Sequence, residues 1–230
     1  MVFCGIQKLT LLDYPGKTAC TLFSGGCDFR CPFCHNFELV TGGVEPAMDT
    51  EELVSFLEKR RSLLDGVVFS GGEPCLHADL PDCMRRVKDM GFLVKLDTNG
   101  HHPDMLRRVS EQGLVDYIAM DIKNSPEKYA QTAGIPGDRL DMSRIRESIS
   151  LIMEAPDYEF RTTVVGGLHE EADFHGIGEL IRGAKRYFLQ PFTDRDTVPD
   201  RSLAAPTAEE LAVYRDIMRE YVEEVSIRGV

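Results

Sequence analysis

The feature that most constrains the fold of this chain is a regular alternation of short apolar runs with amphipathic stretches. Six apolar runs are predicted strands, at residues 19–23, 67–69, 92–96, 117–120, 160–165 and 187–189. Such alternation predicts a parallel sheet with helical crossovers. Six units are too few for a closed eight-stranded barrel, which leaves an open sheet or a partial barrel. We take a partial, open parallel β/α barrel with about six β/α units as the predicted α/β fold.

The predicted helices carry recognisable start signals. Asp49 and Glu52 form a capping-box pair at the start of a helical series of apolar residues, which we expect to continue to Leu64. Thr207 and Glu210 form a second such pair before the last predicted helix.

Length and composition narrow the class of protein. The chain has 230 residues with 43% hydrophobic content, which suits one folded domain over residues 1–230. No apolar run approaches the roughly 20 residues that span a bilayer, and residues 1–12 lack a secretory cleavage site. We therefore expect a cytoplasmic protein without a membrane partner. The formal net charge of −12 also disfavours non-specific nucleic-acid binding.

Polar or glycine-rich clusters follow the predicted strands, at residues 24–36, 70–73, 97–100, 121–123 and 166–167. In parallel α/β folds, ligands bind at the carboxyl ends of the strands. These clusters are therefore expected to meet at one site.

Three cysteines of the first cluster, Cys27, Cys31 and Cys34, have the spacing C-x3-C-x2-C. Thiolates suit zinc and iron–sulfur clusters. Zinc would need a fourth ligand such as His35, whereas an iron–sulfur cluster held by three thiolates would keep one metal corner open. The other cysteines are predicted to be small buried hydrophobic residues: Cys4, Cys20, Cys75 and Cys83. The histidines outside the motif are predicted to lie at the surface: His77, His101, His102, His169 and His175.

This motif resembles the signature of the radical S-adenosylmethionine superfamily, with aromatic Phe33 directly before the third cysteine. The continuation Cys34-His35-Asn36 resembles the activating enzymes of glycyl radical enzymes. Residues 5–17 look most like anaerobic ribonucleoside-triphosphate reductase activating proteins. The resemblance implies a [4Fe-4S] cluster held by Cys27, Cys31 and Cys34, with Phe33 and His35 close to bound S-adenosylmethionine.

The same resemblance implies further cofactor-binding residues at the strand ends. Gly71, Gly72 and Glu73 match a segment that binds the methionine amino group of the cofactor, although a glycine pair alone would indicate only a turn. The positions of Asp97, Lys123 and Arg161 also match cofactor-binding residues of the activating enzymes. Each has a simpler explanation as a strand-end or paired charge.

Asp97, Thr98 and Asp121 are predicted to end neighbouring strands, where two carboxylates would repel one another. By resemblance to activators of pyruvate formate-lyase, we expect a monovalent cation, Na⁺ or K⁺, to bind there. Neutralisation by Lys123 or Arg161 alone is the alternative.

The implied activity is reductive cleavage of S-adenosylmethionine, with an electron from flavodoxin or ferredoxin. The resulting 5′-deoxyadenosyl radical would abstract hydrogen from a glycine of a partner glycyl radical enzyme, with anaerobic ribonucleotide reductase favoured. Activators of pyruvate formate-lyase carry a histidine where this chain has Thr193, so the partner could differ. The alternatives are a pyruvate formate-lyase-like partner, a small-molecule substrate such as a deazapurine precursor, a zinc module, and a simple electron-transfer protein.

Overall fold

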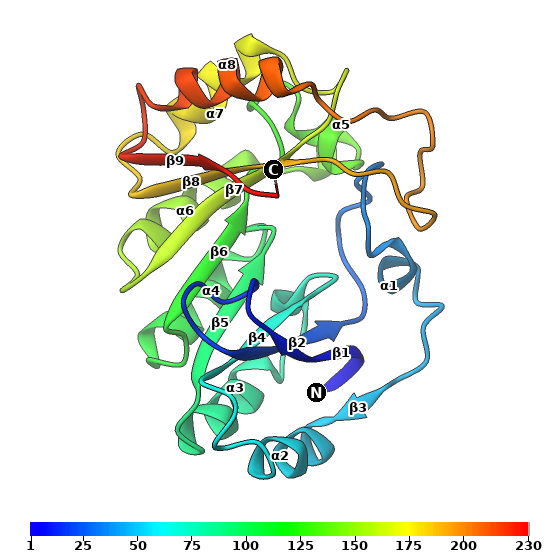
Figure 1. Cartoon of the computed structure of the whole chain (residues 1–230), viewed down its shortest axis with the longest axis vertical. Helices are drawn as coiled ribbons and strands as arrows, with labels where there is room; N and C mark the ends of the chain where they lie inside the picture. The colour runs from blue at the N-terminus through cyan, green and yellow to red at the C-terminus, as the bar shows by residue number, and fades with distance from the viewer. Residues whose placement is uncertain (230) are drawn as a thin grey trace.

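The computed structural model describes residues 1–229, which form one open nine-stranded sheet in the order β3-β1-β2-β4-β5-β6-β7-β8-β9 (Figure 1). Seven strands are parallel, and β1 and β3 pair antiparallel at one edge. The open β/α barrel is therefore confirmed. The strands are β1 (Val2–Thr10), β2 (Ala19–Ser24), β3 (Met48–Asp49), β4 (Gly66–Gly71), β5 (Leu93–Thr98), β6 (Tyr117–Asp121), β7 (Tyr158–Val164), β8 (Arg186–Pro191) and β9 (Glu224–Ile227).

All six predicted strands are present, as β2 and β4 to β8. The sequence interpretation missed β1, β3 and β9, which lie at the two edges of the sheet. Edge strands are covered on fewer sides, so their sequences carry a weaker apolar pattern. In β1, for example, Gln7 and Lys8 are exposed within the strand.

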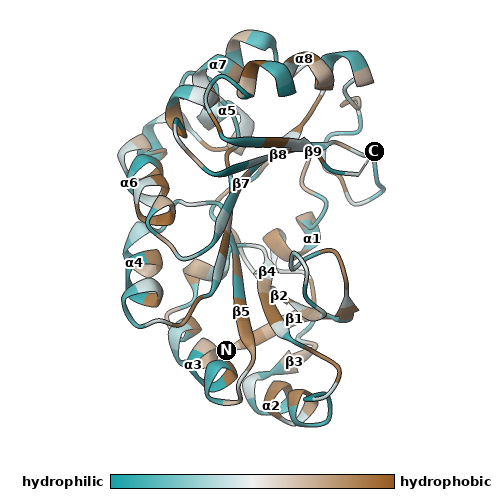
Figure 2. Cartoon of the chain, turned by 60° about the vertical axis from the view of Figure 1, so that its left-hand side comes forward, coloured by the Kyte–Doolittle hydropathy of each residue, from teal (hydrophilic) through white to brown (hydrophobic). Residues whose placement is uncertain are grey.

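Helices flank the convex outer face of the curved sheet, with apolar sides turned toward the strands (Figure 2). The burial of Leu53, Leu57, Val87 and Leu106 on successive helices shows how this layer closes the core. The helices are α1 (Phe37–Thr41), α2 (Thr50–Glu58), α3 (Leu80–Asp89), α4 (Pro103–Glu111), α5 (Tyr129–Ala133), α6 (Met142–Met153), α7 (Glu171–Leu180) and α8 (Ala208–Met218), with 3₁₀ turns η1 (Pro74–Leu76) and η2 (Gly137–Arg139).

Both predicted capping boxes are confirmed. The Glu52 amide donates to the Asp49 carboxylate at 2.9 Å, and the Glu52 carboxylate accepts from the Asp49 amide at 3.0 Å. Thr207 and Glu210 make the equivalent pair of hydrogen bonds at the start of α8. The predicted length of α2 is wrong, however, because the helix ends at Glu58. Tight turns follow, and they let Leu64 pack into the core.

The longest helix among residues 1–229 has 12 residues, and none of the described helices combines the length and apolar character that a bilayer span requires.

Candidate functional site

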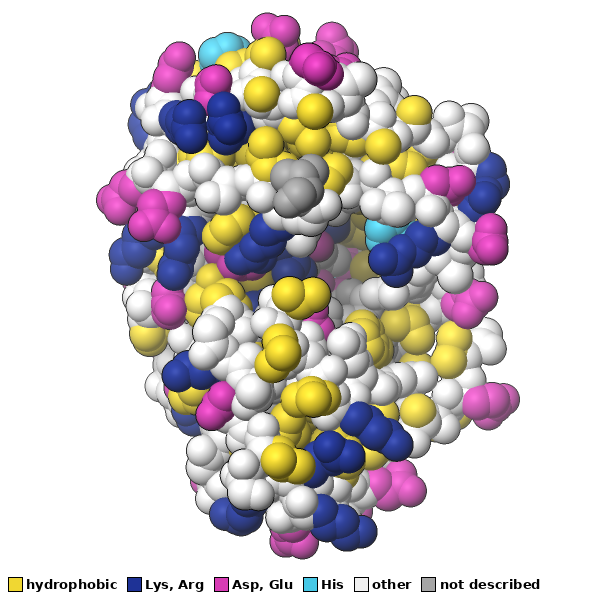
Figure 3. Space-filling view, in the orientation of Figure 1, with side chains coloured by type: hydrophobic (Ala, Val, Ile, Leu, Met, Phe, Trp, Pro, Cys, Tyr) yellow, Lys and Arg dark blue, Asp and Glu magenta, His cyan; other side chains and the backbone are white. Residues whose placement is uncertain are grey.

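A cavity of about 490 Å³ lies at the carboxyl ends of the parallel strands, within the size range of small-molecule sites. On the face seen in Figure 3, the molecule is hollowed near its middle, where basic and acidic side chains gather. The cavity collects nearly all of the predicted site residues, from five segments far apart in sequence. They are Cys27, Cys31, Phe33, Cys34, His35, Gly71, Gly72, Asp97, Thr98, Asp121, Lys123 and Arg161.

The cysteine loop, residues 24–36, is tied to its neighbours by backbone hydrogen bonds. The Gly72 amide donates to the Ser24 carbonyl at 2.9 Å, and the Glu73 amide donates to the Gly26 carbonyl at 2.8 Å. On the other side, the Arg30 amide donates to the Ala133 carbonyl at the end of α5, also at 2.8 Å. The loop is therefore held just before the first cysteine of the motif and again between Cys27 and Cys31.

The glycine pair after β4 is required by this close approach. A Cβ on Gly72 would lie only 1.8 Å from the carbonyl oxygen of Gly26. Gly71 has a φ of +114°, and a Cβ there would meet the Ser24 backbone nitrogen at 2.3 Å. Any side chain at either position would push the cysteine loop away from β4.

The three motif thiols are free and face the same cavity. Burial raises the pKa of Cys27 to about 12 and that of Cys31 to about 11, and it also raises the pKa of Cys34. A thiolate in this environment needs a compensating positive charge, and bound iron or zinc supplies one. Backbone support is present as well, since the Phe29 amide points at the Cys27 sulfur at 3.4 Å. The thiols therefore fit a metal centre.

The zinc alternative fits less well. Nε2 of His35 lies 2.7 Å from the carbonyl oxygen of Thr193, and its ring stacks on Phe192. Among the residues that line the cavity, Cys27, Cys31 and Cys34 are the only cysteines. A closed four-ligand zinc site would require His35 to leave its present contact or to coordinate through its other ring nitrogen.

A network of buried charges forms the wall opposite the cysteine loop. Nε of Arg161, on β7, lies 2.5 Å from the Asp121 carboxylate on β6, and its other arm reaches Asp97 on β5 at 3.4 Å. Lys123 pairs with Asp121 at 3.0 Å, and Lys95 pairs with Asp97. Two carboxylates thus pair directly with three cations, and the buried Glu159 carboxylate, two residues before Arg161 on β7, also acts on Arg161.

These pairings set the protonation states. Burial by itself would raise the pKa of Asp97 and of Asp121, but Arg161 and the neighbouring lysine of each acid together outweigh it and hold both pKa values below their usual range. Burial would lower the pKa of Lys123, but the Asp121 carboxylate raises it overall. All of these groups are therefore charged at neutral pH.

Glu73 was expected among the cofactor-binding residues, but its side chain points elsewhere. Its carboxylate does not line the cavity; it accepts hydrogen bonds from the Cys75 amide at 3.0 Å, the Thr98 hydroxyl at 2.9 Å and the Asn99 amide at 2.6 Å. It therefore fastens β5 to the segment after β4. Because the Thr98 hydroxyl donates to Glu73, that side chain is not directed to the pair Asp97 and Asp121.

Several residues of the site escaped the sequence interpretation. Lys95 is almost fully buried within β5 and could have been noticed as a charge inside an apolar run, the reasoning applied to Arg161. Apart from Arg161, the residues that line the cavity and lie outside the predicted clusters carry no distinctive sequence pattern: Asp13, Val40, Thr163, Gln190 and Arg195.

The prediction for the histidines outside the motif is wrong except for His175, which is exposed. His169 is buried, with one ring nitrogen accepting from the Val165 amide and the other 2.9 Å from the Lys123 carbonyl. His77, His101 and His102 are partly buried, because each binds a group on or beside the cysteine loop. Of the other cysteines, Cys20, Cys75 and Cys83 are buried as predicted, whereas Cys4 is only partly so.

Comparison with known proteins agrees with this geometry. The family model of the radical SAM superfamily matches residues 21–181. A proposed glycyl-radical enzyme activating enzyme of Methanocaldococcus jannaschii is 31% identical over 98% of this chain and 95% of its own length. A 7-carboxy-7-deazaguanine synthase of Thermococcus kodakarensis is 27% identical over 72% of this chain and 71% of its length. Among solved structures, a radical SAM methyltransferase of Sphaerobacter thermophilus shares the fold, with a TM-score of 0.70, 18% identity, and coverage of 96% of this chain and 69% of that one.

A partial barrel with three thiols in a cavity at its strand ends is the arrangement of a radical SAM enzyme, and this chain belongs to the radical SAM superfamily. Membership implies a [4Fe-4S] cluster and S-adenosylmethionine as its cofactors. Within the superfamily, similarity over 98% of the chain to one such protein, and over 52% and 51% to two others, groups the chain with the glycyl-radical enzyme activating enzymes.

Proposed function

We propose that this enzyme installs a glycyl radical on a partner enzyme, and that the partner is anaerobic ribonucleoside-triphosphate reductase. The observation that carries the proposal is the joint placement of three thiols and of the cations Lys123 and Arg161 in a single cavity. The choice of partner rests on the resemblance of residues 5–17 to activators of that reductase.

Each wall of the cavity has a distinct task in this proposal. Cys27, Cys31 and Cys34 hold the cluster, and the backbone at Gly71 and Gly72 accepts the amino group of the cofactor. Lys123 and Arg161 bind its carboxylate. Phe33 and His35 line the floor beside the cysteines. When bound, the cluster and S-adenosylmethionine supply the electron and the carbon radical that abstracts hydrogen from the substrate.

The size of the cavity supports a substrate that enters from outside. A volume of about 490 Å³ is near the lower half of the range for small-molecule sites. The cluster and S-adenosylmethionine would both have to fit in this space. A backbone loop of a partner protein, approaching the open side of the barrel, needs only to bring one glycine to the mouth.

The ion pairs of the cavity wall favour neutralisation of the two carboxylates by protein side chains, rather than by the predicted Na⁺ or K⁺ ion. Asp97 and Asp121 share Arg161, and each has a lysine of its own. The third predicted ligand, the Thr98 hydroxyl, is hydrogen bonded to Glu73. A cation would have to displace at least one of these partners.

The electron donor in this proposal is flavodoxin or ferredoxin, and the compartment is the cytoplasm. Exposed Asn36 and Glu38, directly after the cysteine loop, offer the donor an approach close to the cluster. Seven free cysteines suit a reducing compartment. The net charge of −12 gives no support for a nucleic-acid partner.

Electron paramagnetic resonance tests the proposal. The cluster-loaded enzyme, dithionite and S-adenosylmethionine are mixed anaerobically with the cognate anaerobic reductase, and with a reductase whose radical-site glycine is replaced by alanine. We expect a glycine-centred radical in the first mixture only. A radical signal with a pyruvate formate-lyase-like enzyme, and none with the reductase, would show that the partner is the former.

A second candidate, a radical enzyme acting on a deazapurine precursor, is favoured by the similarity to 7-carboxy-7-deazaguanine synthase over 72% of this chain. Formation of 7-carboxy-7-deazaguanine without any protein radical would establish it in place of the activase.

A further inference from the structure

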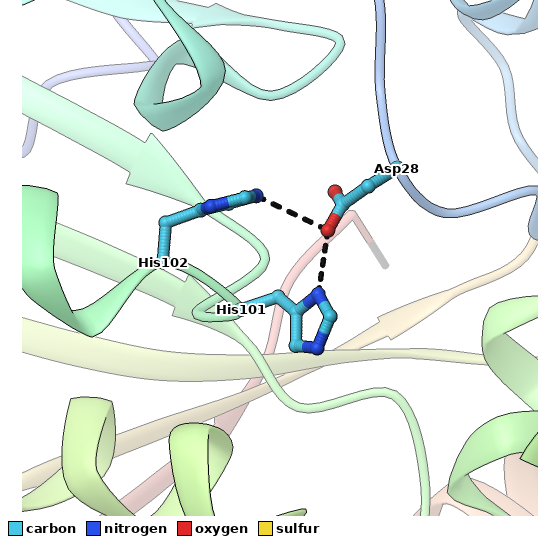
Figure 4. Close-up of side chains that lie close together, drawn as sticks. All are labelled: Asp28, His101 and His102. Carbon is cyan, nitrogen blue, oxygen red and sulfur yellow. Dashed lines mark hydrogen bonds and ion pairs between the residues drawn. The ribbon is translucent and has the colours of Figure 1, made fainter. Parts of the chain in front are cut away.

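Beside the cavity, three side chains that the proposed reaction does not use converge on one point. Asp28 comes from the cysteine loop, and His101 and His102 come from the segment that links β5 to α4 (Figure 4). Nδ1 of His101 lies 2.6 Å, and Nε2 of His102 lies 3.1 Å, from the same carboxylate oxygen of Asp28. One donor atom of each residue lies within 4.8 Å of the other two.

We propose that Asp28, His101 and His102 bind a divalent transition metal ion of the Zn²⁺ class, at a site separate from the three thiols. Two imidazole nitrogens and one carboxylate oxygen are a ligand set that zinc and ferrous iron accept, whereas Mg²⁺ and Ca²⁺ prefer oxygen ligands. Ligand atoms bound at about 2.1 Å in a tetrahedral arrangement around such an ion lie about 3.4 Å apart. The present donor spacing needs only a small adjustment to reach that arrangement.

The surroundings orient these ligands. The second oxygen of Asp28 accepts a hydrogen bond from the Asn99 side chain at 2.8 Å, which fixes the carboxylate plane. The backbone carbonyl of His101 accepts from Nε of Arg144 at 2.9 Å, which holds the residue that carries the first imidazole. Support of this kind is common around metal ligands. The three side chains keep 15% to 23% of their surface exposed, so an ion and its water ligands can reach them.

A competing arrangement needs no ion. In it, both histidines donate hydrogen bonds to Asp28, and the trio simply fastens the cysteine loop to the end of β5. Nε2 of His101 is buried and has no hydrogen-bond partner in the described chain. Metal binding through Nδ1 would place a proton on that nitrogen, which costs binding free energy. Measured metal content separates the two arrangements.

The ion would link the cysteine loop, one residue after Cys27, to the strand that carries Asp97. The site therefore predicts an effect on the loop that does not depend on catalysis. Bound zinc should raise the melting temperature of the chain and slow proteolysis of residues 24–36, and both effects should disappear in His102→Ala.

The decisive experiment measures zinc and iron in the same sample. The cluster-loaded chain, with its thiols occupied, is dialysed anaerobically against micromolar Zn²⁺ and analysed for both elements. We expect about one zinc per chain in addition to the cluster iron. His101→Ala and His102→Ala should each weaken zinc binding by at least about 10-fold, since a lost ligand should cost at least as much as a lost outer-shell partner. His175→Ala, an exposed histidine bound to Tyr221, is the matched control and should keep the zinc.

A second variant tests whether the zinc is bound by the motif thiols, and whether the loss of zinc reflects misfolding. In the triple variant Cys27→Ser, Cys31→Ser, Cys34→Ser, Co²⁺ should give absorption bands of nitrogen and oxygen ligation without sulfur charge transfer, and adding His102→Ala should remove them. Equal zinc in the parent, His101→Ala and His102→Ala would overturn the metal site and leave the hydrogen-bonded clamp. Zinc that depends on His102 in a chain unable to hold iron would contradict the proposed function and support this site.

Discussion

Two buried charge clusters occupy the same strands of the sheet, and they are balanced differently. Toward the amino ends of β6 and β7, fully buried Glu159 accepts a hydrogen bond from the Tyr117 hydroxyl at 2.6 Å and two from the Arg228 guanidinium, each at 2.6 Å. Toward the carboxyl ends, Asp97 and Asp121 face three cations.

The difference separates a structural cluster from a binding cluster. The Glu159 cluster has one acid and one base in direct contact, and it fastens the segment after β9 to the sheet. The cluster at the cavity places two of its cations, Lys123 and Arg161, among the lining residues. Cations that line a cavity can bind an anionic ligand, which we expect for this cluster. The predictions below test this division.

The largest expected effect concerns the thiols of the cavity. Replacing Cys27, Cys31 or Cys34 by alanine should remove the cluster, so that iron falls from about four atoms per chain to nearly none after anaerobic reconstitution. Cys83→Ala, which removes a buried thiol far from the cavity, should retain the iron. Full iron in any of the three motif variants would show that the cavity is not the cluster site.

The next largest effect is expected on ligand binding, from a change in the charge cluster at the cavity. Lys123→Ala should weaken S-adenosylmethionine binding by about 2 kcal/mol, about 30-fold, because it removes a charge-assisted contact. The free energy of unfolding should change little, since Asp121 keeps Arg161. Isothermal titration and urea unfolding measure the two quantities, with Lys128→Ala, a lysine paired to Asp173 outside the cavity, as the control.

Arg228→Met should give the opposite result. Loss of the guanidinium leaves the Glu159 carboxylate buried and unpaired, which should lower the free energy of unfolding by about 2 to 4 kcal/mol, less than for a fully buried pair because Arg228 is partly exposed. Affinity for S-adenosylmethionine should stay at the parent value. If Arg228→Met weakened the ligand as much as Lys123→Ala, the two clusters would not be separate.

The Glu159 cluster should also have a smaller effect, on the stability of the fold at low pH. Burial alone would raise the pKa of Glu159, but the Arg228 hydrogen bonds hold it below the usual value of 4.5. A lowered folded pKa contributes stability that is present above about pH 4.5 and is lost as the pH falls through the folded pKa. Glu159→Gln should therefore lose less stability than the parent on acidification from pH 6 to pH 3. Identical pH profiles of the melting temperature would contradict this assignment.

The smallest expected effect concerns monovalent cations. Because Arg161 and two lysines already neutralise Asp97 and Asp121, affinity for S-adenosylmethionine should change less than about twofold when tetramethylammonium replaces Na⁺ and K⁺ at constant ionic strength. A larger loss that disappears in Asp121→Asn would restore the predicted cation site.

The sequence was informative wherever a residue type has a narrow structural meaning. Strand ends marked by Gly71-Gly72 or by Asp97 could be placed at one edge because parallel strands share their direction. Arg161 could be singled out because a lone charge in an apolar strand requires a partner.

Side-chain direction and pairing across the sheet could not be obtained in this way. Glu73 carried the expected motif, yet its carboxylate turns behind the cavity to bind Thr98 and Asn99. The contact of Asp28 with His101 and His102 joins residues more than 70 positions apart, and it depends on the fold of the cysteine loop. Such contacts follow from tertiary packing, and the periodicity of residues along the chain contains no information about them.

Isotope transfer tests the central claim most directly. Partner reductase is prepared with α-deuterated glycine and mixed anaerobically with the reduced, cluster-loaded enzyme and S-adenosylmethionine, and 5′-deoxyadenosine is analysed by mass spectrometry. The account predicts deuterium in the 5′-deoxyadenosine, in an amount that rises with the glycyl radical signal. Formation of 5′-deoxyadenosine without deuterium, in the presence of a folded and bound partner, would contradict it.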